Sequence, residues 1–267
     1  MTTTTPPLVA TYPVFPDKHA HDGMVTPEEM LAHRRRGGRL PALPAPRGAV
    51  ICLERGLPEQ MRRRVRVRHV GRLLGDLYSV RAHRDRVLVL ANFGLGAPAV
   101  AAQADELIAM GATQLVSVAL CGGLQHDLQP GDVVVVDSAI RDEGTSHHYL
   151  PPARDIDADP GLVAALVRAL AAQGITPRTG RVWSTDAPYR ETREEVVAHQ
   201  RDGVLGVDME LAALLAVARR RGVRAAGVLV AGDNLAGGTW RPPARLDEMR
   251  RSLQCAYRAA VEAADDH

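Results

Sequence analysis

Residues 203–238, GVLGVDMELAALLAVARRRGVRAAGVLVAGDNLAGG, decide the fold class of this chain. The apolar stretch 204–207 predicts a short strand, and the polar tripeptide Asp208-Met209-Glu210 then opens an almost wholly apolar helix that continues to Arg221. A second apolar strand is predicted over 223–231. A helix that is apolar on nearly every side and a strand without polar alternation are both buried elements, as in parallel α/β sheets.

Two acidic residues follow these buried strands. Glu210 comes after the first strand and Asp233 after the second. Open α/β folds bind ligands at the carboxyl ends of their parallel strands, so both acids are candidates for chemistry. Each also has a structural alternative. Glu210 would stabilise a helix N-terminus by ~0.3–1 kcal/mol, and Asp233 could cap the loop over 234–238.

The rest of the chain continues the alternation of strands and helices. Strands are predicted over 48–53, 86–93, 114–120, 133–140 and 178–183, and helices over 98–110, 159–173 and 243–265. We therefore predict an α/β fold: one domain over 47–267 whose central mixed, mostly parallel twisted sheet is flanked by helices. Residues 1–46, which hold eight of the 18 prolines, are predicted to form an arm that packs on the domain or on a neighbouring chain.

Composition argues against several partners. Aromatic residues make up only 3% of the chain and the net charge is +2, which disfavours nucleic acid, since single strands stack on aromatic side chains. The uncharged run 87–104 is broken by Gly94, Gly96 and Pro98, so we expect no membrane span. Three cysteines without a CxxC pair, and an N-terminus unlike a signal peptide, favour a reducing cytoplasm.

Two cofactor hypotheses are also disfavoured. Residues 94–99 match the dinucleotide fingerprint G-x-G-x-x-A, but the following strand lacks the acid that this fingerprint needs about 20 residues later. His147 and His148 lie in a predicted polar loop over 141–149; on a strand, adjacent residues point to opposite faces, and no HxH or HxxxH spacing is present. We expect neither a nicotinamide cofactor nor a metal site.

Several motifs, in order along the chain, resemble those of one enzyme family. They are Asn92–Ala99, Cys121–Gln125, Gln129–Val133, Arg141–Tyr149, Ser184–Tyr189, Val207–Glu210 and Gly232-Asp233. This set is similar to that of the purine and uridine nucleoside phosphorylases, which are homo-oligomeric α/β enzymes. The resemblance implies an oligomer built from dimers, such as a hexamer. It also implies a nucleoside substrate with inorganic phosphate as the co-substrate, and it implies no cofactor.

The resemblance assigns roles in breaking an N-glycosidic bond, which builds positive charge on the sugar and negative charge on the leaving base. Glu210 would accept hydrogen bonds from the ribose 2′- and 3′-hydroxyls, with Met209 and His148 beside the sugar. Asp233, buried at its strand tip, would be the general acid at N7 of a purine.

The base would contact four further residues of the matching motifs: Asp186, Tyr189, Arg190 and Asn234. Uridine-specific members read the pyrimidine with a glutamine and an arginine, and the segment Tyr189–Arg193 lacks that glutamine. A purine or 6-aminopurine-like base is therefore favoured over uracil.

The phosphate segment departs from the family. A Thr or Ser hydroxyl normally binds phosphate where this chain has Leu120, which cannot donate a hydrogen bond. The remaining phosphate candidates are Arg55, Gly56, Gly96 and Cys121, with Arg72 lent by a neighbouring subunit. Three functions stay open: phosphorolysis, which leads; hydrolysis by water; and nucleoside binding without catalysis.

Overall fold

The computed structural model describes residues 15, 18–38, 40, 43–243 and 245–266. The strands are β1 Gly48–Cys52, β2 Val67–Arg72, β3 Asp76–Val80, β4 Val87–Ala91, β5 Gln114–Gly123, β6 Val133–Asp142, β7 Asp155–Asp157, β8 Arg178–Thr185, β9 Gly206–Asp208 and β10 Arg224–Asn234. The α-helices are α1 Pro27–Arg36, α2 Leu57–Gln60, α3 Arg62–Val65, α4 Ala97–Ala109, α5 Ser146–Tyr149, α6 Pro160–Ala171, α7 Arg193–Arg201, α8 Leu211–Arg221 and α9 Leu246–Ala263. Three 3₁₀ turns, Lys18–Ala20, Arg81–His83 and Pro188–Arg190, complete the described elements.

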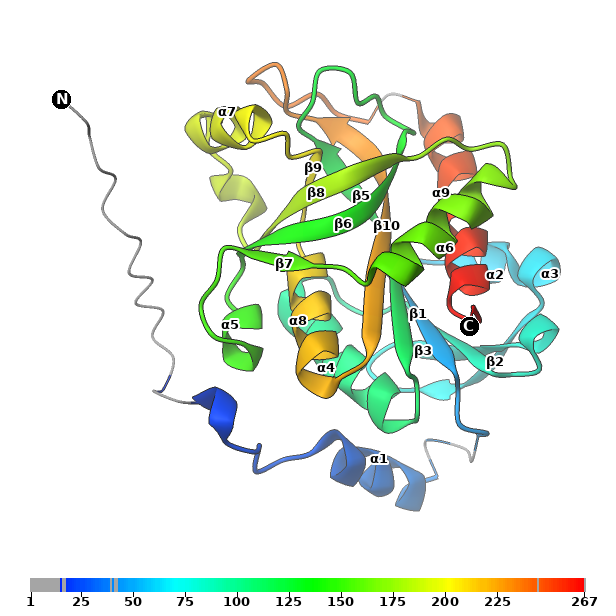
Figure 1. Cartoon of the computed structure of the whole chain (residues 1–267). Helices are drawn as coiled ribbons and strands as arrows, with labels where there is room; N and C mark the ends of the chain where they lie inside the picture. The colour runs from blue at the N-terminus through cyan, green and yellow to red at the C-terminus, as the bar shows by residue number, and fades with distance from the viewer. Residues whose placement is uncertain (1–14, 16–17, 39, 41–42, 244, 267) are drawn as a thin grey trace.

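One part of the sheet closes on itself. Strands β10, β6, β8, β9 and β5 pair in that order, and β10 also pairs with β5, so these five strands form a ring. From β5 the sheet continues outward through β1, β4, β3 and β2 (Figure 1). Parallel pairs join β1 to β4 and β5, β10 to β5, and β8 to β6 and β9. Antiparallel pairs join β3 to β2 and β4, and β7 to β6. The predicted mixed sheet of one α/β domain is confirmed.

Helices cover both faces of this sheet because their sequences leave them little polar surface. Every residue of α8 from Leu211 to Ala218 is buried, and α8 packs against α4 and against the strands β5, β6 and β10. On the other side α9 packs against α6, β5 and β10 (Figure 1). The apolar stretch that predicted a buried strand, helix and strand therefore lies at the centre of the molecule.

The described part of the predicted N-terminal arm packs on the same chain. Thr26 and Glu29 form a capping box that starts α1, and α1 lies against α4. Two ion pairs fasten it: Arg34 to Glu106 at 3.0 Å and Arg221 to Glu28 at 2.7 Å. Residues 1–14 of the arm lie outside the described residues.

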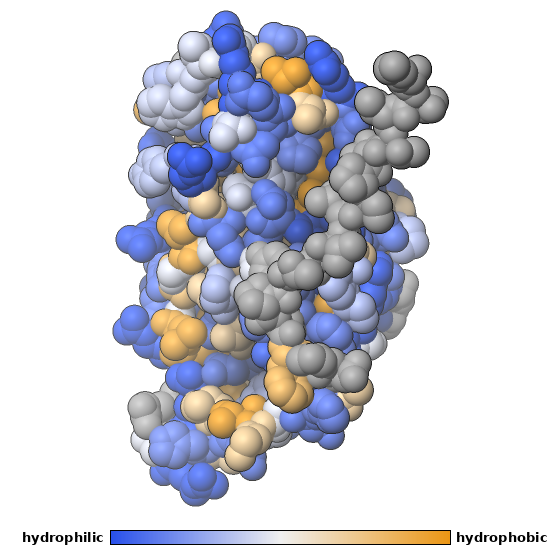
Figure 2. Space-filling model, turned by 90° about the vertical axis from the view of Figure 1, so that its left-hand side faces the viewer, coloured by the Kyte–Doolittle hydropathy of each residue, from blue (hydrophilic) through white to orange (hydrophobic). Residues whose placement is uncertain are grey.

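The described residues on the face shown in Figure 2 are mainly hydrophilic, with apolar side chains in scattered patches. Across the described ranges, none of the helices combines the length and the apolar character that crossing a bilayer requires.

The segment with the two adjacent histidines differs from the prediction. His147 and His148 lie in the short helix α5 rather than in an irregular polar loop. The cause is Glu143, whose buried carboxylate accepts hydrogen bonds from the backbone N–H groups of Thr145 and Ser146 and so starts a helical turn. His147 is buried there and His148 is exposed.

Candidate active site

A cavity of about 910 Å³ opens where the carboxyl ends of β1, β5 and β10 meet the segments that follow β8 and β9. Its size falls within the range of about 300–1,000 Å³ that small-molecule sites occupy. Carboxylates from four different segments line it: Glu54, Glu191, Asp208, Glu210 and Asp233. Arg193 is the one Lys or Arg side chain on the wall formed by the described residues.

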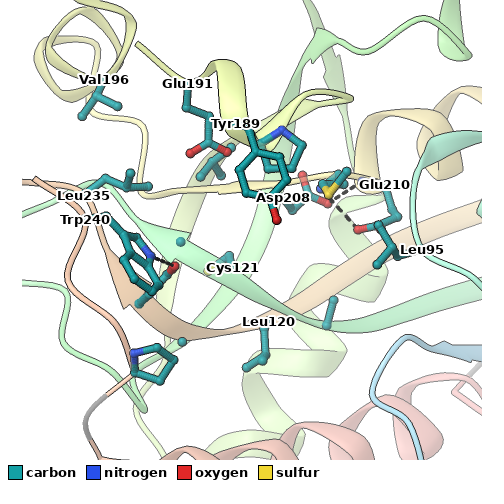
Figure 3. Close-up of a pocket in the computed structure, with 18 of the residues that line it drawn as sticks. Leu95, Leu120, Cys121, Tyr189, Glu191, Val196, Asp208, Glu210, Leu235 and Trp240 are labelled. Atoms are coloured by element: carbon teal, nitrogen blue, oxygen red, sulfur yellow. Dashed lines mark hydrogen bonds between the residues drawn. The ribbon is translucent and has the colours of Figure 1, made fainter. Parts of the chain in front are cut away.

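Glu210 is a buried acid with a defined orientation, 6% exposed. One carboxylate oxygen accepts a hydrogen bond from the backbone N–H of Gly96 at 2.7 Å, and the other from the N–H of Met209 at 3.2 Å. The Glu210 side chain lies beside Leu95 at the wall of the cavity (Figure 3). Burial, and then the neighbouring carboxylate of Asp208, raise the pKa of Glu210 to about 7. The fold thus holds a carboxylate at the cavity wall that is readily protonated near neutral pH.

Asp208 has a structural task beside Glu210. One of its oxygens accepts hydrogen bonds from the N–H groups of Glu210 (3.1 Å) and Leu211 (2.7 Å), so it caps the start of α8. The other oxygen accepts the hydroxyl proton of Ser184 at 2.5 Å. Burial raises the pKa of Asp208, and these three donors oppose that rise. Asp208 therefore fixes the position of Glu210 through the helix start.

Asp233 lies at the end of β10, just after a β-bulge at Ala231. It is half-buried rather than buried, so the expectation of a buried acid at this strand tip is wrong; the bulge turns this residue out of the regular strand. The indole Nε1–H of Trp240 donates a 2.6 Å hydrogen bond to its Oδ2 (Figure 3). Asp233 thus faces the cavity with one oxygen engaged.

Glu191 lies in the loop between β8 and α7, and Arg193 is the first residue of α7. Burial, then Asp233 and then Glu195 raise the pKa of Glu191 to about 7. The carboxylate of Glu191 points into the cavity from above Trp240 in the view of Figure 3. Arg193 packs its guanidinium against Gly238, where a Cβ would lie 2.5 Å from an arginine nitrogen, and the φ of 70° at this position also favours glycine.

The remaining wall is apolar. Leu53, Leu95 and Leu120 line it, and the only carboxyl group there is Glu54, whose pKa burial raises. Cys121 also reaches this wall, but its thiol is buried and burial raises its pKa far above neutrality. A thiol held in the neutral form is a poor nucleophile.

Six of the residues singled out from the sequence line this cavity together. They are Tyr189, Met209, Glu210, Asp233, Leu120 and Cys121. Gly96 stands directly behind Glu210 as its hydrogen-bond donor. Segments distant in the chain thus meet at one site, as the carboxyl-end rule predicts.

Four residues expected beside the sugar or the base lie outside the lining of the cavity. The ring of His148 lies 2.8 Å from the ammonium group of Lys18. Asp186 accepts the backbone N–H of Gly144, and Arg190 is exposed outside the lining. The Asn234 side chain bonds backbone groups of Leu128 and Ala236. Asn234 thereby anchors its own loop instead of facing the cavity.

Besides Gly96, three residues expected at phosphate lie outside the lining of this protomer. The N–H of Gly56 donates to the Asn92 side chain at 3.0 Å, and the neighbouring Arg55 does not reach the cavity. Arg72 is exposed at the outer edge of the sheet, 3.9 Å from Asp76.

Sequence reasoning missed several lining residues. Glu54, Glu191 and Trp240 lie on loops whose course only the folded chain determines. One signal was available, because Trp240 is one of only two tryptophans and follows Asp233 closely in the chain. No grouping of three metal-binding side chains occurs within the described ranges.

Comparison with known proteins agrees with this geometry. Residues 53–264 match the model of the phosphorylase superfamily. The chain is 32% identical to a guanosine phosphorylase of Halorubrum lacusprofundi over 166 residues, which is 61% of this chain and 67% of that protein. It is 33% identical to a DeoD-type purine nucleoside phosphorylase of Dichelobacter nodosus (63% and 71% covered) and 25% identical to a uridine phosphorylase of Salmonella typhimurium (81% and 92% covered). The crystal structure of uridine phosphorylase from Vibrio fischeri superposes with a TM-score of 0.67 at 25% identity, over 81% of this chain and 91% of that one. The chain therefore belongs to the phosphorylase superfamily, as an enzyme of the nucleoside phosphorylase class.

Proposed function

We propose that this protein cleaves the N-glycosidic bond of a purine nucleoside with phosphate, releasing the free base and ribose 1-phosphate. One observation carries the proposal: two carboxylates, Glu210 and Asp233, face one cavity from different environments, one deeply buried and one half-buried. Breaking the glycosidic bond needs one group for the sugar and another for the departing base.

Glu210 suits the sugar. When ionised it accepts hydrogen bonds, and its two oxygens match the vicinal 2′- and 3′-hydroxyls of a ribose. The N–H groups of Gly96 and Met209 already hold this carboxylate, so little reorganisation accompanies binding. Its negative charge also favours the positive charge that builds on the sugar in the transition state.

Asp233 and Glu191 suit the base. A protonated Asp233 donates to N7 as the base leaves, which neutralises the charge left by the broken bond. The Glu191 carboxylate can accept adjacent N–H donors, such as N1–H and the 2-amino group of a 6-oxopurine. When protonated, it can instead pair with N1 and the amino group of a 6-aminopurine. The relative named guanosine phosphorylase supports the first of these bases.

Tyr189 is fully exposed and stands at the mouth of the cavity (Figure 3). An aromatic ring there can stack on a base that enters. We assign it to base contact, as the family motif suggests.

For the nucleophile, water is a second candidate besides phosphate. Leu53, Leu95 and Leu120 form a wall without a hydroxyl group, and the Glu54 carboxyl there disfavours an anion. This wall favours water as the attacking group, with hydrolysis to base and ribose. Phosphate would require donors from backbone groups near Leu120 and Cys121, from Arg55 and Gly56, or from Arg72 of a neighbouring subunit.

A panel of nucleosides, each incubated at zero and saturating phosphate, separates these functions. Chromatography reads free base, ribose 1-phosphate and ribose. Purine release that depends on phosphate and yields ribose 1-phosphate supports the proposal, whereas release without phosphate that yields ribose supports hydrolysis. Binding without any product supports a nucleoside-binding protein. Glu210→Ala is the control, since it must abolish turnover while the circular dichroism spectrum of the fold is kept.

The phosphate assignment to Arg72 implies an oligomer. Arg72 is exposed and far from the cavity lining of its own chain, so only a second copy could receive it. Light scattering tests this: a homo-oligomer at micromolar concentration is expected, and a monomer would remove Arg72 from the site.

A further inference from the structure

Trp240 has an unusual position for a large aromatic residue. Its side chain is 62% exposed, yet it lines the cavity and donates its only polar hydrogen to Asp233 Oδ2 at 2.6 Å. Burying the ring in the core would stabilise the fold more, since a tryptophan hides a large apolar area. Its location is therefore explained by the contact with Asp233 and not by packing.

The loop after β10 is built to return Trp240 to Asp233. The backbones of Asn234 and Arg241 exchange two hydrogen bonds, 3.1 and 2.9 Å long. Within this closed loop the N–H of Gly238 bonds the carbonyl of Leu235, and the N–H of Ala236 bonds the Asn234 side chain. The indole is thus held by a short, internally bonded loop.

The other oxygen of Asp233 is placed against β5. A Cβ added to Gly122 would lie 3.0 Å from Asp233 Oδ1, so the absence of a side chain there leaves room for the carboxyl group. None of the hydrogen bonds seen among the described residues involves Oδ1. Asp233 therefore has one oxygen bound by Trp240 and one oxygen available at the cavity.

We propose that Trp240 is the positioning residue for the acid: its indole N–H occupies Oδ2 of Asp233, so that the acidic proton sits on Oδ1 and is presented to N7 of the leaving purine. This inference rests on the proposed function. An indole N–H only donates, so Oδ2 can only accept from it. When the C1′–N9 electron pair moves into the base, the proton passes from Oδ1 to N7 and Asp233 becomes a carboxylate. The bond from Trp240 then becomes charge-assisted and stronger.

The test uses guanosine and 7-methylguanosine. The second nucleoside already carries a methyl group and a positive charge at N7, so its base leaves as a neutral molecule without receiving a proton. Trp240→Phe keeps an aromatic ring and removes the N–H. We expect kcat/KM for guanosine to fall by about 10- to 100-fold, a part of the 10²–10⁴ that general acids contribute. For 7-methylguanosine it should change by less than about twofold, and Asp233→Asn should show the same pattern with a larger loss.

A double-mutant cycle adds a second readout. Trp240→Phe should have almost no further effect on guanosine cleavage in the Asp233→Asn background, since the indole acts through Asp233. Arg241→Ala changes an exposed loop side chain and is the control for general disturbance of the loop; both substrates should be unaffected.

Equal losses on both substrates, no loss on either, or additive effects in the cycle would each overturn the role of Trp240 while leaving the proposed function standing. Failure of the proposed glycosidic cleavage itself has a different signature, because the wild-type protein would then cleave neither nucleoside. That result would remove the assignment to Trp240 together with the function.

Discussion

Glu210 shows how one residue acquires its chemistry from its neighbours. A carboxyl in water is ionised at neutral pH, but here burial and the Asp208 carboxylate raise the pKa to about 7. The N–H groups of Gly96 and Met209 lower it and limit the rise. Both protonation states of Glu210 are therefore accessible in the range where an enzyme works.

The first prediction concerns pH. Since only the ionised Glu210 accepts both sugar hydroxyls, kcat/KM for a purine nucleoside should rise as pH increases through about 7, measured with dianionic phosphate kept saturating. Glu210→Gln should lower kcat/KM by about 100-fold or more, as expected when hydrogen bonds to a charged group are lost.

Glu191 provides the control, because its pKa is also raised to about 7. Glu191→Gln should retain the rising limb if Glu210 causes it. If the rising limb of the pH profile disappears in Glu191→Gln and persists in Glu210→Gln, the group that titrates near pH 7 is Glu191 and not Glu210.

The second prediction concerns Leu120. Under phosphorolysis, Leu120→Thr adds a hydroxyl donor to the apolar wall and should lower KM for phosphate by about tenfold, the effect of one hydrogen bond to a charged group. KM for the nucleoside should stay within about twofold. Leu120→Val is the matched control, since valine has the shape of threonine without its hydroxyl. Equal effects of the two variants would show that the change in volume, not the hydroxyl, is responsible.

At the scale of elements, the start of α8 links the core to the site. Asp208 caps α8, and Ser184 on β8 donates to Asp208 while its own oxygen accepts the N–H of Ala212 at 3.0 Å. All of these groups are buried. One serine thus ties the helix to the neighbouring strand and, through Asp208, sets the place of Glu210.

The third prediction tests this link. Ser184→Ala leaves an Asp208 oxygen and the Ala212 N–H without a partner in a buried place, so the free energy of unfolding should fall by about 1–3 kcal/mol. Urea unfolding followed by circular dichroism measures the change. Thr192→Ala removes the half-buried cap of α7 and should cost about 1 kcal/mol. If Ser184→Ala costs no more than a few tenths of a kcal/mol, the hydroxyl is not a required tie.

At the scale of the whole molecule, the closed ring of strands gathers five carboxyl groups and one arginine around one cavity. Such an arrangement costs stability when the acids are ionised, because like charges repel and burial disfavours charge. Glu191 and Glu210 both have a pKa raised from 4.5 to about 7. The folded state therefore binds more protons than the unfolded state between these values.

The fourth prediction follows from this proton linkage. The contribution of these two acids to the free energy of unfolding is greatest below pH 4.5, and it decreases as the pH rises toward about 7. Glu191→Gln removes one of the two groups, so urea unfolding at pH 5, 6, 7 and 8 should show a smaller decrease than in the wild type. Glu194→Gln, an exposed neighbour in α7, should behave like the wild type. An unchanged slope in Glu191→Gln would show that this carboxyl is solvated in the folded state.

Much of the fold could be predicted because buried helices and strands have an apolar pattern that can be recognised within a short segment of the sequence. The apolar helix after Glu210 and the unbroken strand before Asp233 are buried as expected, with α8 and β10 within a few residues of the predicted bounds. The segment 141–149 departed from the prediction because a single side chain, Glu143, starts a helical turn there, and such side-chain caps leave no periodic pattern.

The sequence by itself determined the α/β class, the burial of residues 203–238 and the presence of acids at two strand ends, because hydrophobic patterning is local and burial depends on it directly. Only the tertiary structure decided which loops meet. Closure of β10 onto β5 brings Trp240 and Glu191 to Asp233 and leaves His148 outside the lining. Strand order is set by packing between segments far apart in the chain, and no local pattern encodes it.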